Sequence, residues 1–471
     1  MSKRSYTLCL LAMLGALSAC SLAPEYRRPP APIAPRWSET QVSTAVLPEL
    51  RVLLPEARLQ ALLQLAVENN RDLRIATARV AEAQALYGVQ RADRLPSVDL
   101  AAGRAASRSP ADLSLSGRAT TGQRYDVSAG LLSFEVDFWG RVRSLNEAAL
   151  ASYLATEEAQ RAFRLSLVAD VANAYFGWRE AEERCSLARA SVANRRSALD
   201  LVDQRRSVGI ASDLDYLLAS GALEAARADL ASLERARSAA VNLLNQLVGV
   251  TAQPDNLPAP LGLAEQGVVF DFAPGLPAEV LLRRPDVLAA EQRLIAANAH
   301  IGAARAAFLP RISLVGNVGT ASSELSRLFE SGQGAWSFQP LLRLPLFDAG
   351  RNSANLDLAQ VRRSIAVADY ERTLQQAFRE VNDLLSARPQ LLLQLDALRA
   401  GEEVQARRLL LTEARYKAGV ASYLEVLDAQ REHYAAQQNL VQTRRTLLAS
   451  AAQLYKALGG DAAMDEPVAR R

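Results

Sequence analysis

The sequence is short of the residues that carry most catalytic and metal chemistry. Its 471 residues include only two histidines, His300 and His433, and three cysteines, and aromatic residues make up 6% of the chain. This inventory argues against the histidine and cysteine clusters of metal centres and nucleophilic active sites. The 54 basic and 51 acidic residues nearly balance, unlike the excess of Lys and Arg in nucleic-acid-binding proteins. We expect no enzyme, no cofactor, no metal site and no nucleic-acid partner.

Proline is also absent from a long internal stretch. None occurs between Pro110 and Pro254, over 143 residues. Because proline interrupts helices, its absence predicts long uninterrupted helices. A soluble chain of this length would be expected to hold about three domains of roughly 150 residues each, and the proline distribution argues against that simple division.

The N-terminus has the layout of a secretory signal. Basic residues precede an apolar stretch over residues 8–17, which is too short to span a bilayer as a stable helix. Small residues then lead to Cys20, as in the lipobox of bacterial lipoproteins. We expect residues 1–19 to be a signal peptide and Cys20 to become an acylated N-terminus. The alternative is an ordinary signal peptide followed by a chance cysteine.

The residues after Cys20 are typical of a tether. Five prolines fall between residues 24 and 35, so residues 20–57 are expected to form an extended N-terminal segment. Ser21, rather than Asp, follows the cysteine, which in lipoproteins of this kind implies sorting to the outer membrane. Outer-membrane lipid is therefore an expected contact of the protein.

The chain contains two copies of one unit. Gly140 and Gly209 reappear as Gly350 and Gly419, at a constant offset of 210. A period this long indicates duplication of a whole architectural unit and not a solenoid repeat. The expected divisions are repeat 1 at 58–249, an irregular linker at 250–277, repeat 2 at 278–459 and a C-terminal tail at 460–471.

The spacing between glycines predicts the length of the long helix in each repeat. From Gly140 to Gly209, and again from Gly350 to Gly419, 68 residues intervene. A helix of that length reaches about 100 Å, far more than a globular domain requires. Pro389 lies inside the second one, where we expect a kink or a short interruption. The expected elements are an entering helix in each repeat, long helices at 141–208 and 351–418, and return helices at 212–248 and 422–458.

Two segments with partial apolar alternation lie between the entering and long helices of each repeat. They predict strands at about 97–108, 123–137, 311–320 and 336–347. Their lengths fit tilted membrane-crossing strands, although a pair of soluble hairpins would have similar alternation. Since an open sheet exposes unpaired backbone groups to hydrocarbon, other copies of the chain must close it. The expected fold class is an α+β membrane protein.

One segment carries a distinctive motif. It consists of Gly275, Leu276, Pro277, Leu281, Leu282, Arg283, Arg284, Pro285, Asp286, Val287, Ala290 and Glu291. With the run Arg415, Tyr416, Gly419, Leu424, Leu427, Asp428, Ala429, Gln430 and Arg431, it closely resembles outer membrane factors of the TolC type. More narrowly, it resembles the lipoprotein (NodT/OprM-like) branch of resistance-nodulation-division (RND) efflux systems. The resemblance covers the whole mature chain.

This resemblance implies an architecture and a role. It implies a homotrimer whose 12-stranded outer-membrane β-barrel, with four strands per chain, is continuous with a long periplasmic α-helical barrel. The protein would be the passive exit duct of a tripartite RND-type efflux pump for drugs or other toxic solutes. Its partners would be a periplasmic adaptor (membrane fusion protein) and an inner-membrane RND transporter. Alternatives are the duct of a type I secretion or heavy-metal efflux system, or a lipid-anchored periplasmic coiled-coil adaptor.

The two helix-to-helix turns farthest from the strands are candidate functional sites. Gly209 and Gly419 mark these turns, and Ser212 and Ser422 follow them at equivalent positions. The resemblance implies that the periplasmic adaptor docks on this tip.

The resemblance also implies a periplasmic gate just beyond the second turn. Leu424 and Asp428 are four residues apart and share a helix face, and the resemblance makes them the constriction, with Glu425 adjacent. It further places Asp215 opposite Tyr416 and Arg415, as contacts that hold neighbouring helices shut. Any one of these charges could instead belong to an ordinary solvated helix face.

The acylation site can be tested directly. We predict that Cys20→Ala abolishes incorporation of labelled palmitate, because the thiol is the expected acceptor, while the trimer can still form through its strands. The measurement is metabolic labelling followed by purification of the protein. Persistent label in the variant would rule Cys20 out.

Overall fold

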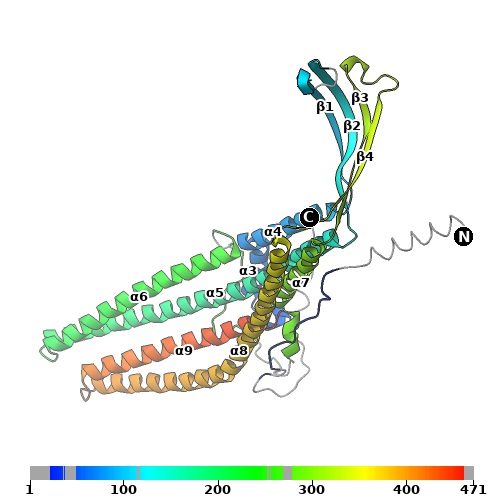
Figure 1. The fold of residues 1–471 in the computed structure, drawn as a ribbon. Coiled ribbons are helices and arrows are strands. Elements are labelled where there is room, and N and C mark those ends of the chain that lie inside the picture. Colours follow the sequence, from blue (N-terminus) through cyan, green and yellow to red (C-terminus); the bar gives the residue numbers. More distant parts are fainter. Residues whose placement is uncertain are drawn as a thin grey trace. The chain divides into compact units, whose positions relative to one another are not determined.

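The computed structural model of the chain is mostly helical and contains one four-stranded antiparallel sheet (Figure 1). It describes residues 22–34, 37, 49–113, 117–251, 254, 256–268 and 278–460. The predicted signal peptide, Cys20 and most of the predicted C-terminal tail lie outside these residues.

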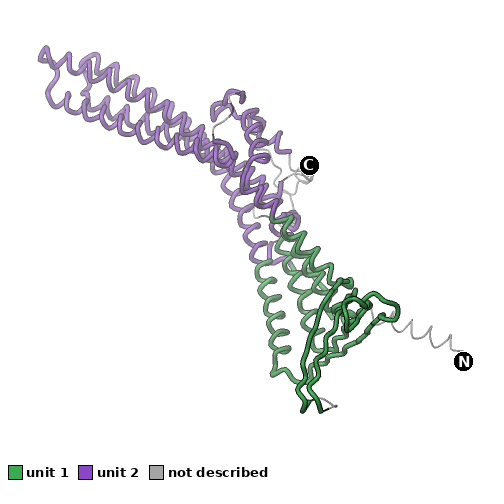
Figure 2. The backbone as a smooth tube through the Cα atoms, turned by 90° about the horizontal axis from the view of Figure 1, so that it is seen from above, with its two compact units in different colours: residues 1–30, 79–157, 289–371 green, residues 31–78, 158–288, 372–471 purple. Residues whose placement is uncertain are grey.

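The chain divides into two compact units, coloured separately in Figure 2. The first comprises residues 1–30, 79–157 and 289–371, and includes the sheet. The second comprises residues 31–78, 158–288 and 372–471, and includes both helix-to-helix turns. Each unit is built from both sequence repeats, so neither repeat is a domain with its own core.

The helices include two of 67 residues each. In chain order the α-helices are α2 (Leu50–Leu53), α3 (Ala57–Asn69), α4 (Arg71–Ala92), α5 (Arg141–Ser207), α6 (Asp213–Val248), α7 (Pro285–Ala306), α8 (Arg351–Lys417) and α9 (Tyr423–Ala457). Three short 3₁₀ helices are η1 (Ala111–Leu113), η2 (Ala278–Arg283) and η3 (Leu325–Arg327).

Two details of the helices differ from the sequence-based expectations. Helix α8 continues through Pro389 without a break, so the interruption that we considered there does not occur, and a kink remains a prediction. Proline removes one backbone donor, and the rest of a 67-residue helix keeps its hydrogen bonds. Helix α2 lies within the segment expected to be an extended tether, because Leu53 and Leu54 are buried there.

The strands are β1 (Val98–Ser109), β2 (Thr120–Val136), β3 (Arg311–Ser322) and β4 (Gly334–Arg343). They pair in the order β1-β2-β3-β4, and each pair is antiparallel. The fourth strand was expected to reach residue 347, which is wrong. The strand ends at Arg343, where its pairing with Arg311 of β3 ends.

The second unit has its own core where α3, α5 and α6 meet. Its largest fully buried side chains include Tyr175 and Phe176 of α5 and Leu244 of α6. The hydroxyl of Tyr175 donates to the carboxylate of the buried Glu56, which also accepts the Leu261 N–H at 2.9 Å. Burial, first, and this hydrogen bond raise the pKa of Tyr175 far above its ordinary value.

The end of α6 is fixed against the end of α3. Gly249 caps α6 in the left-handed region, with φ of 79°. The side-chain amide of Asn70 donates to the Leu247 carbonyl at 2.8 Å, and its oxygen accepts the Leu73 N–H at 2.8 Å. A Cβ at position 249 would lie under 3.0 Å from the Asn69 backbone. Only glycine therefore allows both the cap and the close approach.

This packing predicts a contrast between two glycines with nearly the same φ. Gly209, at 77°, has nothing within 4 Å of its position for a Cβ. Gly209→Ala should therefore cost only the left-handed backbone penalty, about 1 kcal/mol. Gly249→Ala should lower the thermal unfolding midpoint clearly more, because Asn69 must also move. Equal midpoints in the two variants would show that the close approach does not contribute to stability.

Candidate functional site

The sheet has two faces of opposite character. Residues directly opposite one another in an antiparallel ladder share a face, and the pairings align Val98, Leu131, Gly316 and Phe338 in one row. The face that contains this row also carries Leu100, Ala102, Val127, Ala129, Leu314, Val318, Trp336 and Leu342. The opposite face is mainly polar and carries Asp99, Ala101, Gly103, Asp126, Ser128, Ser313, Asn317, Ser337 and Gln339, together with Val315 and Leu341. Toward the far tip of β1, Arg104 and Arg108 lie on the mainly apolar face.

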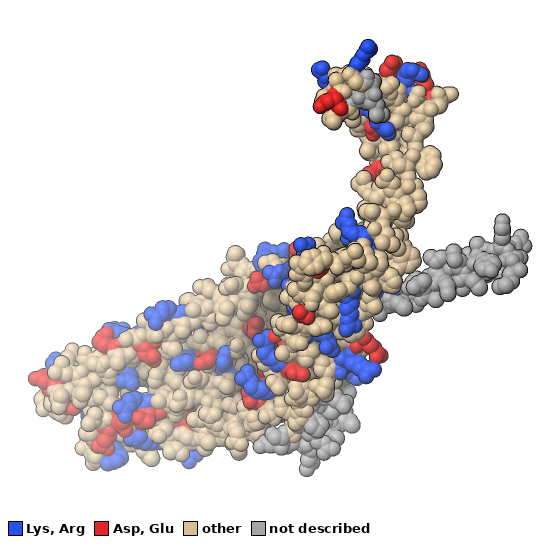
Figure 3. All heavy atoms as spheres, viewed as in Figure 1, with Lys and Arg blue, Asp and Glu red and all other residues tan. Residues whose placement is uncertain are grey.

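The apolar face is open in the single chain. Leu100 is 79% exposed, Trp336 78% and Val318 64%. In Figure 3 acidic and basic residues are interspersed over the helices, whereas those of the sheet gather mainly toward its far tip. A continuous exposed apolar surface of this kind marks contact with a membrane or another protein.

A bulge in β2 preserves the two faces. The register shifts between Leu131 and Phe134, so that Leu131 lies opposite Gly316 and Phe134 opposite Leu314. Without this shift, every β2 residue below it would point to the wrong face. The alternation of side chains in the sequence did not reveal the bulge.

The two helix-to-helix turns have the same geometry. Gly209 and Gly419 have φ of 77° and 76°. After each glycine the next residue's N–H reaches back to close the helix end, from Ile210 to the Arg205 carbonyl at 2.8 Å and from Val420 to the Arg415 carbonyl at 3.0 Å. This is the arrangement of a Schellman cap.

Ser212 and Ser422 begin the return helices with matching capping boxes. The Ser212 hydroxyl accepts the Asp215 N–H, and the Asp215 carboxylate accepts the Ser212 N–H at 3.1 Å. Ser422 and Glu425 make the equivalent pair of hydrogen bonds. Hydrogen bonds from Ser422, its backbone N–H foremost, together with the Arg415 charge lower the pKa of Glu425.

In these capping boxes the Asp215 carboxylate bonds to Ser212, and one oxygen of the Glu425 carboxylate bonds to Ser422. The Glu425 carboxylate also lies 3.8 Å from the Arg415 guanidinium. No hydrogen bond or ion pair joins Asp215 to Tyr416 or Arg415 within the described part of the chain. A contact of this kind between two chains remains a proposal.

Tyr416 belongs to an aromatic cluster that joins the two turns. Its ring lies 5.6 Å from that of Tyr423, and the Arg205 guanidinium lies over it at 4.7 Å. Burial raises the pKa of Tyr423 to about 12. The other residues packed in this cluster include Val202, Ala219, Val426, Leu199, Tyr216 and Leu427. Sequence reasoning missed Tyr423 and Arg205, because nothing in local spacing brings α5 and α9 together.

Asp428 ties the second hairpin together. Its carboxylate accepts from Arg408 of α8 at 2.5 Å and from Arg431 of α9 at 2.8 Å. Leu424, one turn earlier, is 61% exposed. Its apolar side chain cannot form an ion pair or a hydrogen bond of this kind. The sequence identified Asp428 and Leu424 as neighbours on one face, but it gave no indication of Arg408.

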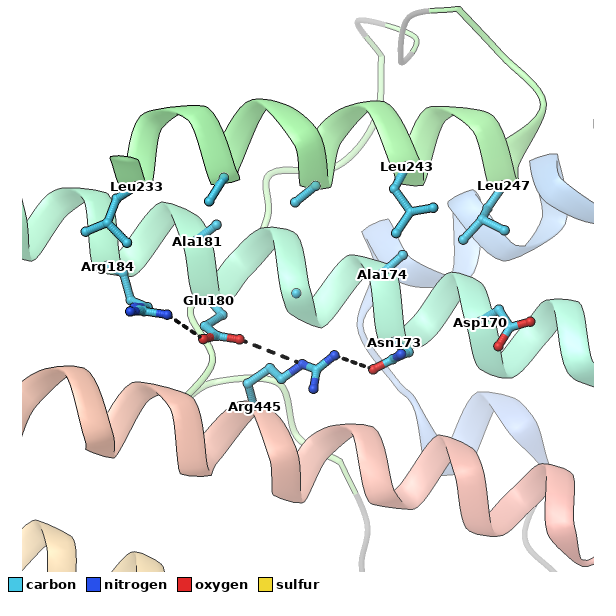
Figure 4. Close-up of a pocket in the computed structure, with 13 residues that line it drawn as sticks. Asp170, Asn173, Ala174, Glu180, Ala181, Arg184, Leu233, Leu243, Leu247 and Arg445 are labelled. Carbon is cyan, nitrogen blue, oxygen red and sulfur yellow. Dashed lines mark hydrogen bonds and ion pairs between the residues drawn. The ribbon is translucent and has the colours of Figure 1, made fainter. Parts of the chain in front are cut away.

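A cavity of about 430 Å³ lies among α5, α6 and α9 in the second unit (Figure 4). Small side chains such as Ala181 leave this space, and Leu243 and Leu247 line one side of it. On the other side Arg445 donates to Asn173 at 2.6 Å and lies 3.8 Å from Glu180. The arrangement is an ion-paired helix interface, without the nucleophile and base pairing of a catalytic site.

Across the described ranges, no group of three His, Cys, Asp or Glu residues could hold a metal ion. In the same ranges, no helix combines the length and apolar character needed to cross a bilayer.

Comparisons with known proteins give one consistent result. The model of the outer membrane efflux protein family matches residues 62–250 and 276–460. The outer membrane protein OprJ of Pseudomonas aeruginosa is 43% identical, over 98% of this chain and 97% of OprJ. The solvent efflux pump outer membrane protein SrpC of Pseudomonas putida is 42% identical, over 98% of each chain.

A solved structure agrees with the fold. The open state of the MtrE outer membrane channel of Neisseria gonorrhoeae has a TM-score of 0.83 to this chain at 39% identity. The match covers 94% of this chain and 98% of that one. The sequence motifs, the two-faced sheet and these matches agree, and the chain belongs to the outer membrane efflux protein family.

Proposed function

We propose that the protein is the outer-membrane duct of a tripartite efflux pump, formed by three copies of the chain. The observation that carries this proposal is the sheet with one apolar face and one polar face, whose edge strands β1 and β4 each pair on one side only. In hydrocarbon such edges must be closed. Three copies would give a 12-stranded barrel with the polar face lining its lumen, and the long helices would form a periplasmic α-helical barrel.

The position of the N-terminal segment is evidence for a lipid anchor close to the barrel. Residues 22–28 lie along α7, where Tyr26 donates to Glu291 at 2.9 Å and Arg28 contacts both Glu291 oxygens at 2.7 Å. Arg305, near the end of α7, donates to the Leu22 carbonyl at 3.1 Å. This direction leads the chain toward the start of β3. An acyl group on Cys20 would therefore enter the same membrane as the strands.

The partners and cargo follow from the proposed role. A passive outer-membrane duct needs an energised transporter in the inner membrane and an adaptor that spans the periplasm between them. The printed name of SrpC states that it serves a solvent efflux pump. We infer that apolar toxic solutes, drugs or organic solvents, are the cargo of this protein as well.

We infer that the adaptor docks around the two turns. Gly209 and Gly419 give the turns one shape, and Ser212 and Ser422 fix the helices that follow. Apolar side chains are exposed at equivalent places beside them, with Ile210 at 74% and Val420 at 65%. Two similar apolar patches suit a helical-hairpin partner that meets both repeats.

We further propose that the gate lies just beyond the second turn. Asp428 holds α9 to α8 through Arg408, and Tyr416 holds the second turn to the first through Tyr423 and Arg205. Repeated around a three-fold axis, Leu424 and Asp428 would form an apolar and an acidic ring. Opening would need outward rotation of these helices, favoured by an adaptor that binds the open arrangement better.

The gate predicts a change in conductance. Asp428→Ala combined with Tyr416→Phe should raise single-channel conductance in planar bilayers, because it removes the acidic ring, the Asp428–Arg408 contact between α9 and α8, and the hydroxyl through which Tyr416 would contact Asp215 of a neighbouring copy. Asp396→Ala is the matched control, since Asp396 is an exposed acid on α8 whose ion-pair partner among the described residues is Arg399, at 3.5 Å. Conductance should stay unchanged in the control. Equal conductance in all three proteins would place the gate elsewhere.

A further inference from the structure

The two open edges of the sheet differ slightly in length. β1 has 12 residues and β4 has 10, and an antiparallel pairing of β4 with β1 of a second copy would satisfy the free backbone groups of both. This inference rests on the proposed assembly from several copies. We propose that the seam has a single register, in which Arg343 of one copy lies opposite Asp99 of the next.

Length alone leaves few possibilities. A ten-residue strand can slide along a twelve-residue strand in only three registers that keep all of its residues paired. These registers place Arg343 opposite Val98, Asp99 or Leu100. Any other register leaves part of β4 unpaired in the membrane, where no water can satisfy its free backbone groups.

The faces of the sheet select one of the three. Asp99 and Arg343 both belong to the polar face, whereas Val98, Leu100 and Leu342 belong to the apolar face. Opposed residues must share a face, so the registers that place Arg343 opposite Val98 or Leu100 would turn the polar face of one copy into hydrocarbon. Only the middle register remains, with Leu342 opposite Leu100 and Leu341 opposite Ala101.

The charges at the base of the sheet favour the same register. Arg343 is the cross-strand partner of Arg311, an unfavourable pairing of like charges. The acid beside them, Glu135, is already held by Arg311 at 2.6 Å and by Arg141 at 2.6 Å. Neither Arg343 nor Asp99 has an ion-pair partner in the part of the chain that the structure describes. The seam would bring these two opposite charges together.

The stagger of the strands is also consistent. The row that begins at Val98, the first residue of β1, reaches β4 at Phe338, five residues before the strand ends at Arg343. Across the four strands of one copy, this row therefore shifts by five residues along the strand direction, away from the base of the sheet. In the proposed seam Phe338 lies opposite Arg104, which continues the shift in the same sense. A stagger of about six residues per copy gives a strand tilt of about 45° in a 12-stranded barrel.

Paired cysteines test the register in the full-length protein. Ala101→Cys with Leu341→Cys places two thiols opposite one another across the seam, within the Cα separation that a disulfide needs. Within one chain β2 and β3 separate the two positions, so any link must join two copies. Mild oxidation should convert the protein to covalent trimers on non-reducing gels. Matched controls are Leu341→Cys with Asp99→Cys or with Gly103→Cys, each displaced by two residues on the same face.

The outcomes separate the register from the assembly. Links in Ala101/Leu341 and none in the displaced controls support the register. Links in a displaced pair, or an unlinked Ala101/Leu341 pair in an intact trimer, overturn the register and leave the proposed trimer standing. A protein that is monomeric when extracted from the membrane overturns both.

Charge reversal gives an independent measurement. Asp99→Arg should lower the temperature at which the trimer dissociates in detergent, because it places a second arginine opposite Arg343, and adding Arg343→Asp should recover most of that shift. Because Arg343→Asp also removes the repulsion with Arg311, its effect is measured both in the Asp99→Arg variant and in the unaltered protein. An equal effect of Arg343→Asp on the dissociation temperature in both backgrounds would contradict the ion pair across the seam.

Discussion

The structure depends on one constraint, the need of every backbone N–H and C=O group in the membrane for a partner. A four-stranded sheet satisfies its inner strands and leaves β1 and β4 with open edges. Because water is absent from hydrocarbon, those edges cannot remain open there. In the assembly that we propose, closure by other copies is therefore part of the fold of this protein. The polar face of the sheet has a use only when closure turns it toward a water-filled lumen.

The long helices are held together in a different way from the strands. A compact apolar core surrounds only part of two helices of 67 residues each, and elsewhere small residues allow close side-by-side packing. Contacts between charged and polar side chains then fix the pairings, as with Arg445 and Asn173 or Asp428 and Arg408. This fits a composition whose charges nearly balance in sign and which has few aromatic residues.

Local features of the sequence predicted much of this organisation. Gly209 and Gly419 located the turns because glycine alone enters the left-handed region without cost, and Ser212 and Ser422 are typical helix caps. Apolar alternation located the strand regions, since its period of two is a property of the strand itself. The resemblance to the family led to the predictions of a membrane location, a duct and partner proteins. Composition and spacing alone did not determine these.

Features that depend on long-range packing could not be predicted in this way. The bulge near Leu131, the contact of Arg205 with Tyr416 and the bond from Arg408 to Asp428 each join segments whose approach no local pattern encodes. The early end of β4 also depends on its pairing with β3, because β4 contains Pro340 and a proline alone does not end this strand. For Asp215 the family resemblance implied a partner on another helix, and within one chain the structure shows its carboxylate in a capping box with Ser212.

The central claim is that three copies close one sheet into a barrel. Native mass spectrometry of the protein extracted from the outer membrane in mild detergent tests it most directly. We expect a complex with the mass of three acylated chains. A complex with the mass of one or two chains would contradict the account.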